Sequence, residues 1–563
     1  TYGITTFVIY FGQVNAAAGG NNVHVCMALN GSGGTIPPFN PTDAAALDAA
    51  LAAIFERVTQ ESRSFASAAV PTVQAQADDK IFVPSFTPLN ASSFTSPASS
   101  APGAGATWNG HLDAFLKPLP INASTGKPDT VNSPCNGTRR SGCHLWDTAL
   151  TMLNQAPTPT EVALLPPTLK IGAADGERRL FYTQASAGST VPVQRRLFQP
   201  QTGLADQEDL WRGMGLTVAD TSNAAAVATA NGKVLNAIKY TLVQKTATVD
   251  VVAGVPTIAT FVLGDIFHSS PVLLSSPARL AYYDNNLEGA GGDCAVGTDK
   301  GYRCFFDRHQ FRRKLLTVGS NDGQLHFFDA GTYDSGVEAF NNGTGREVLS
   351  IAPRALLPMI YRQATVATKQ DWGVDGTIQA DDVFIDPSHT GTPTAADREW
   401  RSIVIGSLRE GGSSVFAIGV TQPDRLTAAT AGDTPNLPQV LGTYVPSCWD
   451  GGTPADCGPV PFGSILWEFT DTSDSDSNGK PDLGDTWSTP NTGRIVLSDA
   501  SGNKITKYVA IFGGGMDPER VFVVRSIPDL SRFKRFALVD AQPGTGNSQL
   551  PVGVVPSVVV DHH

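Results

Sequence analysis

The pattern of hydrophobic and polar positions first predicts an α/β segment over residues 1–63. Residues 5–12 (TTFVIYFG) have an apolar centre and end in glycine, which predicts a buried strand that ends in a turn. A helical period follows, and Thr42 or Asp43 can cap it. The apolar face of this expected helix consists of Leu47, Leu51, Ile54, Phe55 and Val58. A strand followed by an amphipathic helix is typical of α/β folds, so we expect the last part of such a domain here.

Residues 64–260 predict a middle, β-rich region with linkers. Residues 81–83 and 108–116 have the apolar and alternating character of strands, and weaker patterns suggest strands at 236–243 and 249–252. Between the first two lies a stretch rich in Ser, Ala, Pro and Gly, residues 92–106, which we interpret as a flexible loop.

Residues 261–563 contain a repeated unit of strand, glycine-containing turn and strand. Three copies of the unit cover residues 315–329, 402–418 and 507–524, and a further strand is expected at 465–469. The copies recur roughly every 85–105 residues, which is longer than an ordinary propeller blade and requires long insertions. Radially repeated sheets hide strand edges, so we expect a β-propeller, with a β-sandwich as the alternative.

Composition points to a turn-rich protein that does not bind nucleic acid. Charged residues make up 16% of the 563 residues, whereas Gly (56) and Pro (39) are abundant. The net charge is −12, and the basic residues form only short runs such as Arg312-Arg313-Lys314. Nucleic-acid binders need a basic face, so this class is disfavoured. No run of 18 apolar residues predicts a transmembrane helix, and a signal for export would lie upstream of Thr1.

The seven cysteines predict disulfide bonds within polar loops. Six of them lie in local pairs, which are Cys135 with Cys143, Cys294 with Cys304, and Cys448 with Cys457. Such pairs require an oxidising compartment. Zinc is the alternative, but the spacings are not CxxC and only His144 adjoins a cysteine. Cys26 is left over and can pair with a residue outside this chain.

The segment from Asp474 to Asp485 predicts a calcium site. Oxygen ligands fall at positions 1, 3, 5, 9 and 12 of an EF-hand-type loop, position 6 is Gly479, and position 7 offers a backbone carbonyl. The expected ligands are Asp474, Asp476, Asn478, Lys480 (through its carbonyl), Asp482 and Asp485. Asp485 replaces the usual glutamate, and no helical pattern flanks the loop, so we expect a β-type calcium loop rather than a helical sensor.

No motif for catalysis stands out. The chain has no G-x-S-x-G, no P-loop and no HExxH, and we interpret His268 and His326 as structural residues. His268 and Ser269 are adjacent, so in a strand they would point to opposite faces and could not form a catalytic pair. A second acidic cluster is more typical of turns than of a metal site, which is the alternative. Its members are Asp371, Asp375, Asp381, Asp382 and Asp386.

Several motifs, in this order, resemble the PilY/PilC family of type IV pilus biogenesis and tip-adhesin proteins. They are residues 263–271 (LGDIFHSSP), 318–326 (VGSNDGQLH), 374–376 (VDG), 400–412 and 466–469 (LWEF), with weaker similarity at 64–71, 108–112 and 145–147. The resemblance implies a quinoprotein-like β-propeller, incomplete in this chain, that binds Ca²⁺ but no quinone. It also implies that residues 1–63 are the end of a von Willebrand factor A-like domain.

The same resemblance implies a non-enzymatic function at the cell surface. Family members are exported, sit with minor pilins at the pilus tip or the outer membrane, and contact host or abiotic surfaces. They act in adhesion, twitching motility, and pilus assembly and retraction. Two alternatives are a quinone-dependent dehydrogenase, which commonly has a vicinal cysteine pair that this sequence lacks, and a surface or matrix-binding protein unrelated to pili.

Overall fold

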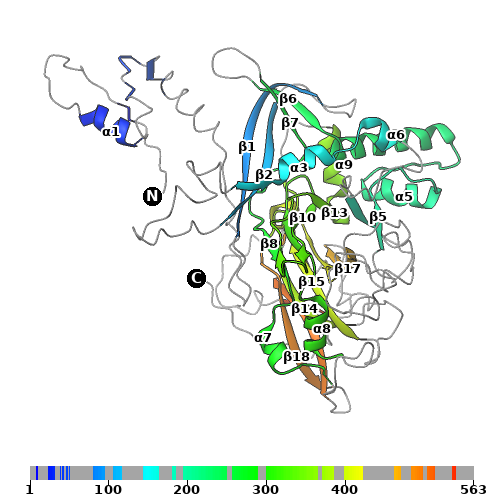
Figure 1. Cartoon of the computed structure of the whole chain (residues 1–563). Coiled ribbons are helices and arrows are strands. Elements are labelled where there is room, and N and C mark those ends of the chain that lie inside the picture. Colours follow the sequence, from blue (N-terminus) through cyan, green and yellow to red (C-terminus); the bar gives the residue numbers. More distant parts are fainter. Residues whose placement is uncertain are drawn as a thin grey trace, which may run out of the picture. The chain divides into compact units, whose positions relative to one another are not determined.

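The computed structural model of the chain falls into two compact units, Thr1–Arg63 and Ser64–His563 (Figure 1). In the first unit it describes residues 8–9, 23–31, 38–39, 41–43, 46–47 and 50. In the second it describes residues 80–95, 105–116, 144–163, 180–184, 194–249, 257–289, 300–365, 371–385, 398–421, 462–470, 483–498, 504–513 and 536–540.

The first unit contains the helix start that the sequence predicts. The Asp43 carboxylate accepts a hydrogen bond from the backbone N–H of Ala46 at 2.8 Å, and residues 46, 47 and 50 are helical. Ile9 forms an isolated parallel bridge with Phe39. A further helix, α1 (Val23–Gly31), was not predicted. The other residues of the predicted strand and helix lie outside the described part of the chain.

The second unit is built mainly from four sheets. Their strand orders are β3-β2-β1-β6-β7, β5-β4-β13-β10-β9-β8, β14-β15-β16-β17 and β18-β19-β20, and β11-β12 is a separate hairpin. The strands of the first sheet are β1 (Lys80–Thr95), β2 (Gly105–Leu116), β3 (His144–Asp147), β6 (Lys245–Val249) and β7 (Thr257–Phe261). Those of the second are β4 (Leu180–Gln184), β5 (Gln194–Leu197), β8 (Val272–Leu274), β9 (Lys314–Gly319), β10 (Leu325–Gly331) and β13 (Glu347–Ala352).

In the second sheet, β4 and β13 run parallel to each other. The strands of the third and fourth sheets and of the separate hairpin are antiparallel to their neighbours. They are β11 (Tyr333–Asp334), β12 (Ala339–Phe340), β14 (Gln379–Ile385), β15 (Glu399–Ser407), β16 (Ser414–Gly419), β17 (Ser464–Thr470), β18 (Asn491–Ser498), β19 (Lys504–Gly513) and β20 (Phe536–Asp540). The first two predicted repeat units are confirmed as the hairpins β9–β10 and β15–β16. Strand 465–469 is confirmed within β17, and 507–513 lies in β19; residues 520–524 lie outside the described residues.

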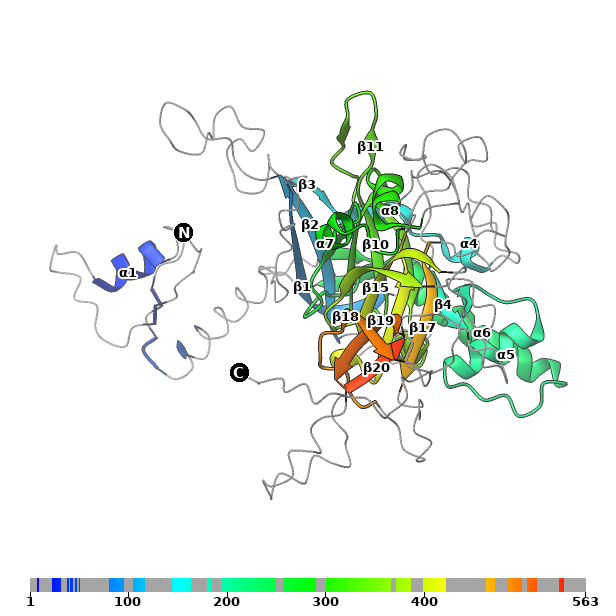
Figure 2. The same cartoon turned by 90° about the horizontal axis from the view of Figure 1, so that it is seen from below.

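The four sheets pack face to face in series (Figures 1 and 2). Alternation along the strands supplies both faces: Phe328 packs toward the first sheet, whereas Phe327 packs toward the third. In the third sheet, Phe416 faces the second sheet, and Ala417 faces the fourth beside Phe512. Each inner sheet is therefore buried on both sides, which explains the continuous apolar runs in the sequence.

Helices pack against these sheets in more than one place. Their bounds are α3 (Thr148–Gln155), α4 (Pro159–Ala163), α5 (Leu204–Gly213), α6 (Ala224–Leu242), α7 (Leu280–Asp284), α8 (Tyr302–His309), α9 (Leu357–Thr365), and the 3₁₀ turns η1 (Arg354–Leu356) and η2 (Arg409–Gly411). Helices α4, α5, α6 and α9 share one apolar core with β4 and β13. No helix in the described part of the chain is long and apolar enough to cross a membrane.

Two predictions for the middle region were wrong. Residues 236–243 were predicted as a strand, but 236–242 belong to helix α6 and Val243 caps it. Asn223 caps this helix by accepting hydrogen bonds from Ala225 and Ala226, and its buried positions, such as Val234, Ala237 and Ile238, recur at a helical period. An apolar run can follow either period, and here the cap and the alanine-rich start decide for the helix.

The predicted flexible loop 92–106 was also partly wrong. Strand β1 continues to Thr95 and β2 begins at Gly105, and the two pair from Lys80↔Leu116 to Ala91↔Gly105. Beyond Ala91, β1 pairs with β6 from Ser93↔Thr248 to Thr95↔Thr246, so pairing with neighbouring strands supports residues whose own composition favours a loop. In contrast, 81–83 and 108–116 are confirmed as strand, and of 249–252 only Val249 is described, at the end of β6.

Candidate functional site at the turns between the sheets

At one end of the third sheet, backbone segments pack on one another without space for side chains. A Cβ on Gly411 would lie 1.9 Å from the carbonyl oxygen of Gly373, and one on Gly376 would lie 2.2 Å from that of Ser407. The Gly376 N–H donates to the same Ser407 oxygen at 3.1 Å. The turn after β15 is thus held directly against the segment that precedes β14, and this contact positions the side chains described next.

Thr486 fixes the chain after the predicted calcium loop onto the β15–β16 turn. Its hydroxyl accepts from the N–H groups of Leu408 (3.1 Å) and Arg409 (3.2 Å) and lies 3.0 Å from the carbonyl oxygen of Gly412. Thr486 is fully buried, whereas the adjacent Trp487 is 43% exposed. The anchor therefore presents Trp487 at the surface beside Arg409.

Arg409 stacks on this tryptophan. Its guanidinium carbon lies 4.3 Å from the centre of the Trp487 ring, and its Nη1 donates to Asp375 Oδ2 at 3.1 Å. The backbone of Arg409 has a φ of 53°, in the left-handed region that favours glycine. Stacking on one side and a carboxylate on the other hold the guanidinium plane in one orientation.

His268 completes the cluster from the segment between β7 and β8. Its Nδ1 donates to Asp375 Oδ2 at 2.6 Å, its backbone N–H donates to Asp375 Oδ1 at 3.2 Å, and its ring also contacts Arg409. Phe267 and Trp372 lie beside the imidazole, with ring centres 4.3 Å and 5.8 Å away. Three donors, two from His268 and one from Arg409, thus compensate the buried charge of Asp375, and the cluster joins a cation to exposed aromatic surface.

The cluster is suited to binding rather than to nucleophilic chemistry. Ser269, next to His268, uses its hydroxyl to accept from the Gly319 N–H at 2.9 Å and is buried. His268 and Ser269 therefore engage different groups of the fold, as adjacent residues of extended chain do. Ser269 is therefore not placed as a nucleophile for His268.

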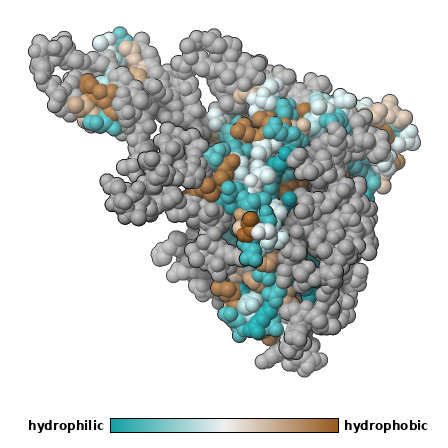
Figure 3. All heavy atoms as spheres, in the orientation of Figure 1, coloured by the Kyte–Doolittle hydropathy of each residue, from teal (hydrophilic) through white to brown (hydrophobic). Residues whose placement is uncertain are grey.

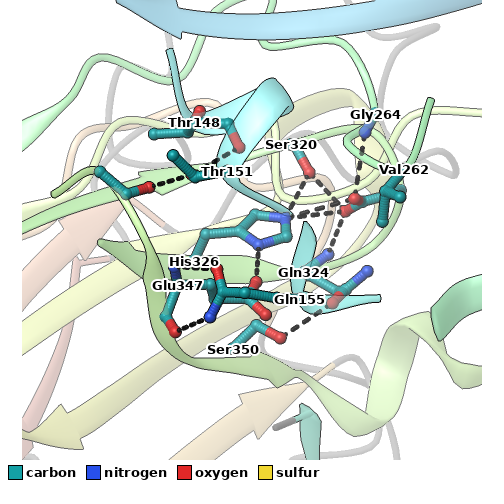
Figure 4. A network of polar contacts seen from close by, with 12 residues as sticks. Thr148, Thr151, Gln155, Val262, Gly264, Ser320, Gln324, His326, Glu347 and Ser350 are labelled. Carbon is teal, nitrogen blue, oxygen red and sulfur yellow. Dashed lines mark hydrogen bonds and ion pairs between the residues drawn. The ribbon is translucent and has the colours of Figure 1, made fainter. Parts of the chain in front are cut away.

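His326 lies in a separate buried network on β10 (Figure 4). Its Nδ1 contacts Glu347 at 2.6 Å, and its Nε2 contacts Asp322 at 3.2 Å and Ser320 at 3.0 Å. Burial lowers the pKa of His326, but the charges and hydrogen bonds of Asp322 and Glu347 outweigh this effect and raise the pKa to about 9. The fully buried imidazole is thus a structural cation that joins β10, β13 and the β9–β10 turn.

Most residues of the predicted calcium site lie outside the described residues. These are Asp474, Asp476, Asn478, Lys480 and Asp482. Asp485 is exposed, and its carboxylate accepts from the Ser413 hydroxyl at 3.3 Å. The last position of the predicted loop is therefore attached to the β15–β16 turn beside Thr486, and calcium binding stays a prediction.

Five of the six cysteines predicted to pair also lie outside the described residues. They are Cys135, Cys143, Cys294, Cys448 and Cys457. Cys304 is disulfide-bonded and buried in α8, and Cys26 is a free, exposed thiol. The pairing of Cys304 with Cys294, and the other two pairs, stay predictions.

The second acidic cluster is divided among separate partners. Asp371 pairs with Arg362, Asp375 with His268 and Arg409, and Asp381 with Arg279. Asp382 accepts from the hydroxyls of Tyr302 and Ser402, and Asp386 lies outside the described residues. Within the part of the chain that the structure describes, no three His, Cys, Asp or Glu side chains converge on a metal position.

Sequence reasoning missed Arg409, Trp487 and the contacts of Asp375. Arg409 precedes Gly411-Gly412 in a hairpin turn, and nothing local shows that residues far along the chain stack on it. The available hint was a long cationic side chain in a turn where glycine is favoured. On the face in Figure 3, the described surface of Ser64–His563 is largely hydrophilic between smaller hydrophobic areas, so no broad apolar patch marks a site there.

Comparison with known proteins gives partial matches to one family. A type IV pilus biogenesis factor PilY1 homolog of Xylella fastidiosa is 29% identical over 165 residues, which cover 29% of this chain and 11% of that protein. The type IV pilus biogenesis factor PilY1 of Pseudomonas aeruginosa (strain UCBPP-PA14) is 26% identical over 237 residues, covering 42% of this chain and 14% of that protein. The chain thus spans only a small part of the length of these curated relatives, and no family model matches it.

A solved structure adds a weak match. The crystal structure of the Pseudomonas aeruginosa PilY1 C-terminal domain has a TM-score of 0.25 and 21% identity, and the match covers 51% of this chain and 38% of that one. The sequence matches define a relative of pilus biogenesis proteins. These matches support the resemblance to the PilY/PilC family that the motifs predicted.

Proposed function

We propose that this chain is part of an exported type IV pilus biogenesis factor that acts at the pilus tip. The observation that supports this function is the similarity to several proteins named type IV pilus biogenesis factor PilY1. In this role the protein contacts minor pilins, promotes pilus assembly, influences retraction and twitching motility, and adheres to a host or abiotic surface. It does so without catalysis.

The proposed scaffold is a quinoprotein-like β-propeller. Four sheets packed in series, with the β15–β16 turn held against the segment that precedes β14, fit the arrangement of successive blades. The first unit, Thr1–Arg63, would be the end of a von Willebrand factor A-like domain, with its capped helix at Asp43.

We further propose that the loop from Asp474 to Asp485 holds a structural Ca²⁺ ion. The oxygen positions of the sequence support this, and the attachment of Asp485 and Thr486 to the β15–β16 turn gives the loop a fixed end. Disulfides at the three cysteine pairs would staple neighbouring loops, in keeping with an exported protein and with the bonded Cys304.

The proposal is tested by deleting the gene in the source bacterium and restoring the whole protein. Cells without the protein should carry fewer surface pili, measured as sheared pilin, and labelled protein should appear at pilus tips by electron microscopy. Comparing cells that can and cannot retract pili separates assembly from retraction. Normal pilus numbers together with no copurification of minor pilins would overturn the proposal and favour a pilus-independent surface protein.

A further inference from the structure

Three arginines in the described part of the chain stack on aromatic rings. Their guanidinium carbons lie 5.8 Å, 5.6 Å and 4.3 Å from the ring centres. The three pairs are Arg279 on Tyr282, Arg303 on Tyr283, and Arg409 on Trp487. Because all three guanidinium groups lie over an aromatic ring, they can be compared by what their hydrogen-bond donors contact.

Arg409 differs from the other two arginines in the hydrogen bonds made by the Nε–Nη2 edge of its guanidinium. Arg279 places both of these donors on the carboxylate of Asp381. Arg303 donates from Nε to the Tyr283 carbonyl at 2.9 Å and from Nη2 to that of Asp284 at 2.8 Å. Arg409 makes its hydrogen bond to Asp375 through Nη1, and no described residue accepts from its Nε or Nη2.

We propose that the Nε–Nη2 edge of Arg409 binds the carboxylate of a ligand. The planar fork of these two donors matches the two oxygens of a carboxylate. The chain uses the same edge in this way internally, since Arg362 contacts Asp371 through Nε and Nη2 at 3.0 Å each. A ligand carboxylate on Arg409 would repeat this pairing at the surface.

The site is organised before any ligand arrives. Thr486 bonds the backbone of Arg409, Trp487 covers one face of the guanidinium, and buried Asp375 holds Nη1. A side chain that is already held loses less conformational freedom on binding. The left-handed backbone of Arg409 adds a second observation, because such strain in a residue other than glycine is concentrated at functional positions.

The surrounding charges favour a ligand with one carboxylate. Glu410, which follows Arg409, and Asp485, two residues before Trp487, are exposed, and the charge of Asp375 offsets that of Arg409. A polyanion would meet more repulsion here than a single carboxylate on an uncharged body. Such a group occurs at the end of a peptide chain and on a single uronate sugar.

The test compares acids with matched neutral analogues on the full chain by saturation-transfer NMR. Acetyl-diglycine is compared with its C-terminal amide, and glucuronate with its methyl ester. At least one acid should bind while its neutral partner does not, and the acid that binds identifies the source of the carboxylate. Binding should also change the fluorescence of Trp487, since that ring lies under the guanidinium.

Substitution of the arginine provides the second arm. Arg409→Lys keeps the charge but removes the fork, and should weaken binding about tenfold or more, as expected for a charge-assisted hydrogen bond. Arg303→Lys is the matched control, because its edge is already used by carbonyls, and should leave binding unchanged. Equal binding of acids and neutral analogues, no binding of either acid, or full binding by Arg409→Lys would overturn the proposal. These binding measurements need no pili, so their result is independent of the proposed pilus function.

Discussion

At the scale of single residues, His326 shows a role that sequence could only partly predict. A histidine within an apolar strand was correctly expected to be structural, but its two carboxylate partners come from a turn and from β13. Alternation along a strand tells which side is buried, and not which charges meet there. The consequence is a buried cation whose protonation is linked to folding.

We predict that His326 makes the protein less stable at alkaline pH. Its pKa is raised from 6.5 in the unfolded chain to about 9 in the fold, so its contribution to stability is complete below pH 6.5 and is lost as the pH rises through 9. The loss should amount to roughly 3 kcal/mol of unfolding free energy. Urea unfolding across this pH range measures it.

Glu347→Gln is the informative variant, because it removes one of the two charges that hold the proton on His326. The alkaline loss of stability should then begin at lower pH, in addition to a general destabilisation from altering a buried pair. Identical pH profiles for the two proteins would show that the His326 network does not control alkaline stability.

The glycines of the turns give a second prediction at this scale. Gly411→Ala should lower the unfolding free energy by roughly 2–4 kcal/mol, because its Cβ would lie 1.9 Å from a backbone oxygen that cannot rotate away. Gly232→Ala is the control, since nothing lies within 4 Å of a Cβ there. That change, inside helix α6, should stabilise by about 0.5–1 kcal/mol. Equal effects of the two substitutions in thermal unfolding would refute the close-packed turns.

At the scale of elements, the strands with a strong pattern were predictable and those shaped by their neighbours were not. The hairpins β9–β10 and β15–β16 combine two apolar runs with a glycine turn, and both were found. The second half of α6 was assigned to a strand, because eight residues of an apolar run cannot distinguish the two periods. Strand β1 extends beyond its apolar residues because it pairs with β2 as far as Ala91 and with β6 from there to Thr95.

The loop from Asp474 to Asp485 supports a prediction that links two elements. Calcium should raise the melting temperature, because a ligand that binds the folded state alone stabilises it. It should also change Trp487 fluorescence, since Asp485, Thr486 and Trp487 are consecutive and Thr486 is bonded to the β15–β16 turn.

Differential scanning fluorimetry with calcium and with chelator measures the stability effect. The double variant Asp474→Ala and Asp476→Ala should abolish both responses. Asp334→Ala, in the distant β11–β12 hairpin, is a control that removes an acidic residue outside the loop. Equal melting curves with calcium and chelator would count against the site.

At the scale of the whole molecule, the sequence indicated repeated β units but not how they associate. The alternation in β10 and β16 shows in retrospect that both faces of these sheets are covered. The order of the sheets, the parallel pairing of β4 with β13, and the helical layer depend on contacts between distant segments. The Arg409 site belongs to the same category, since its residues come from four separate segments.

The face-to-face series of sheets predicts cooperative unfolding of Ser64–His563. Phe416 is 2% exposed in the core between the second and third sheets, so Phe416→Ala should cost about 3–5 kcal/mol through lost burial and a cavity. Because each inner sheet contributes to the cores on both of its faces, the loss should lower the melting of the whole unit in a single transition. Val337→Ala, at a position 70% exposed on the β11–β12 hairpin, should leave the transition unchanged.

Near-ultraviolet circular dichroism and tryptophan fluorescence should report the same midpoint for each variant. Separate midpoints in Phe416→Ala would mean that the sheets unfold independently, and that packing between them contributes less than packing within each one.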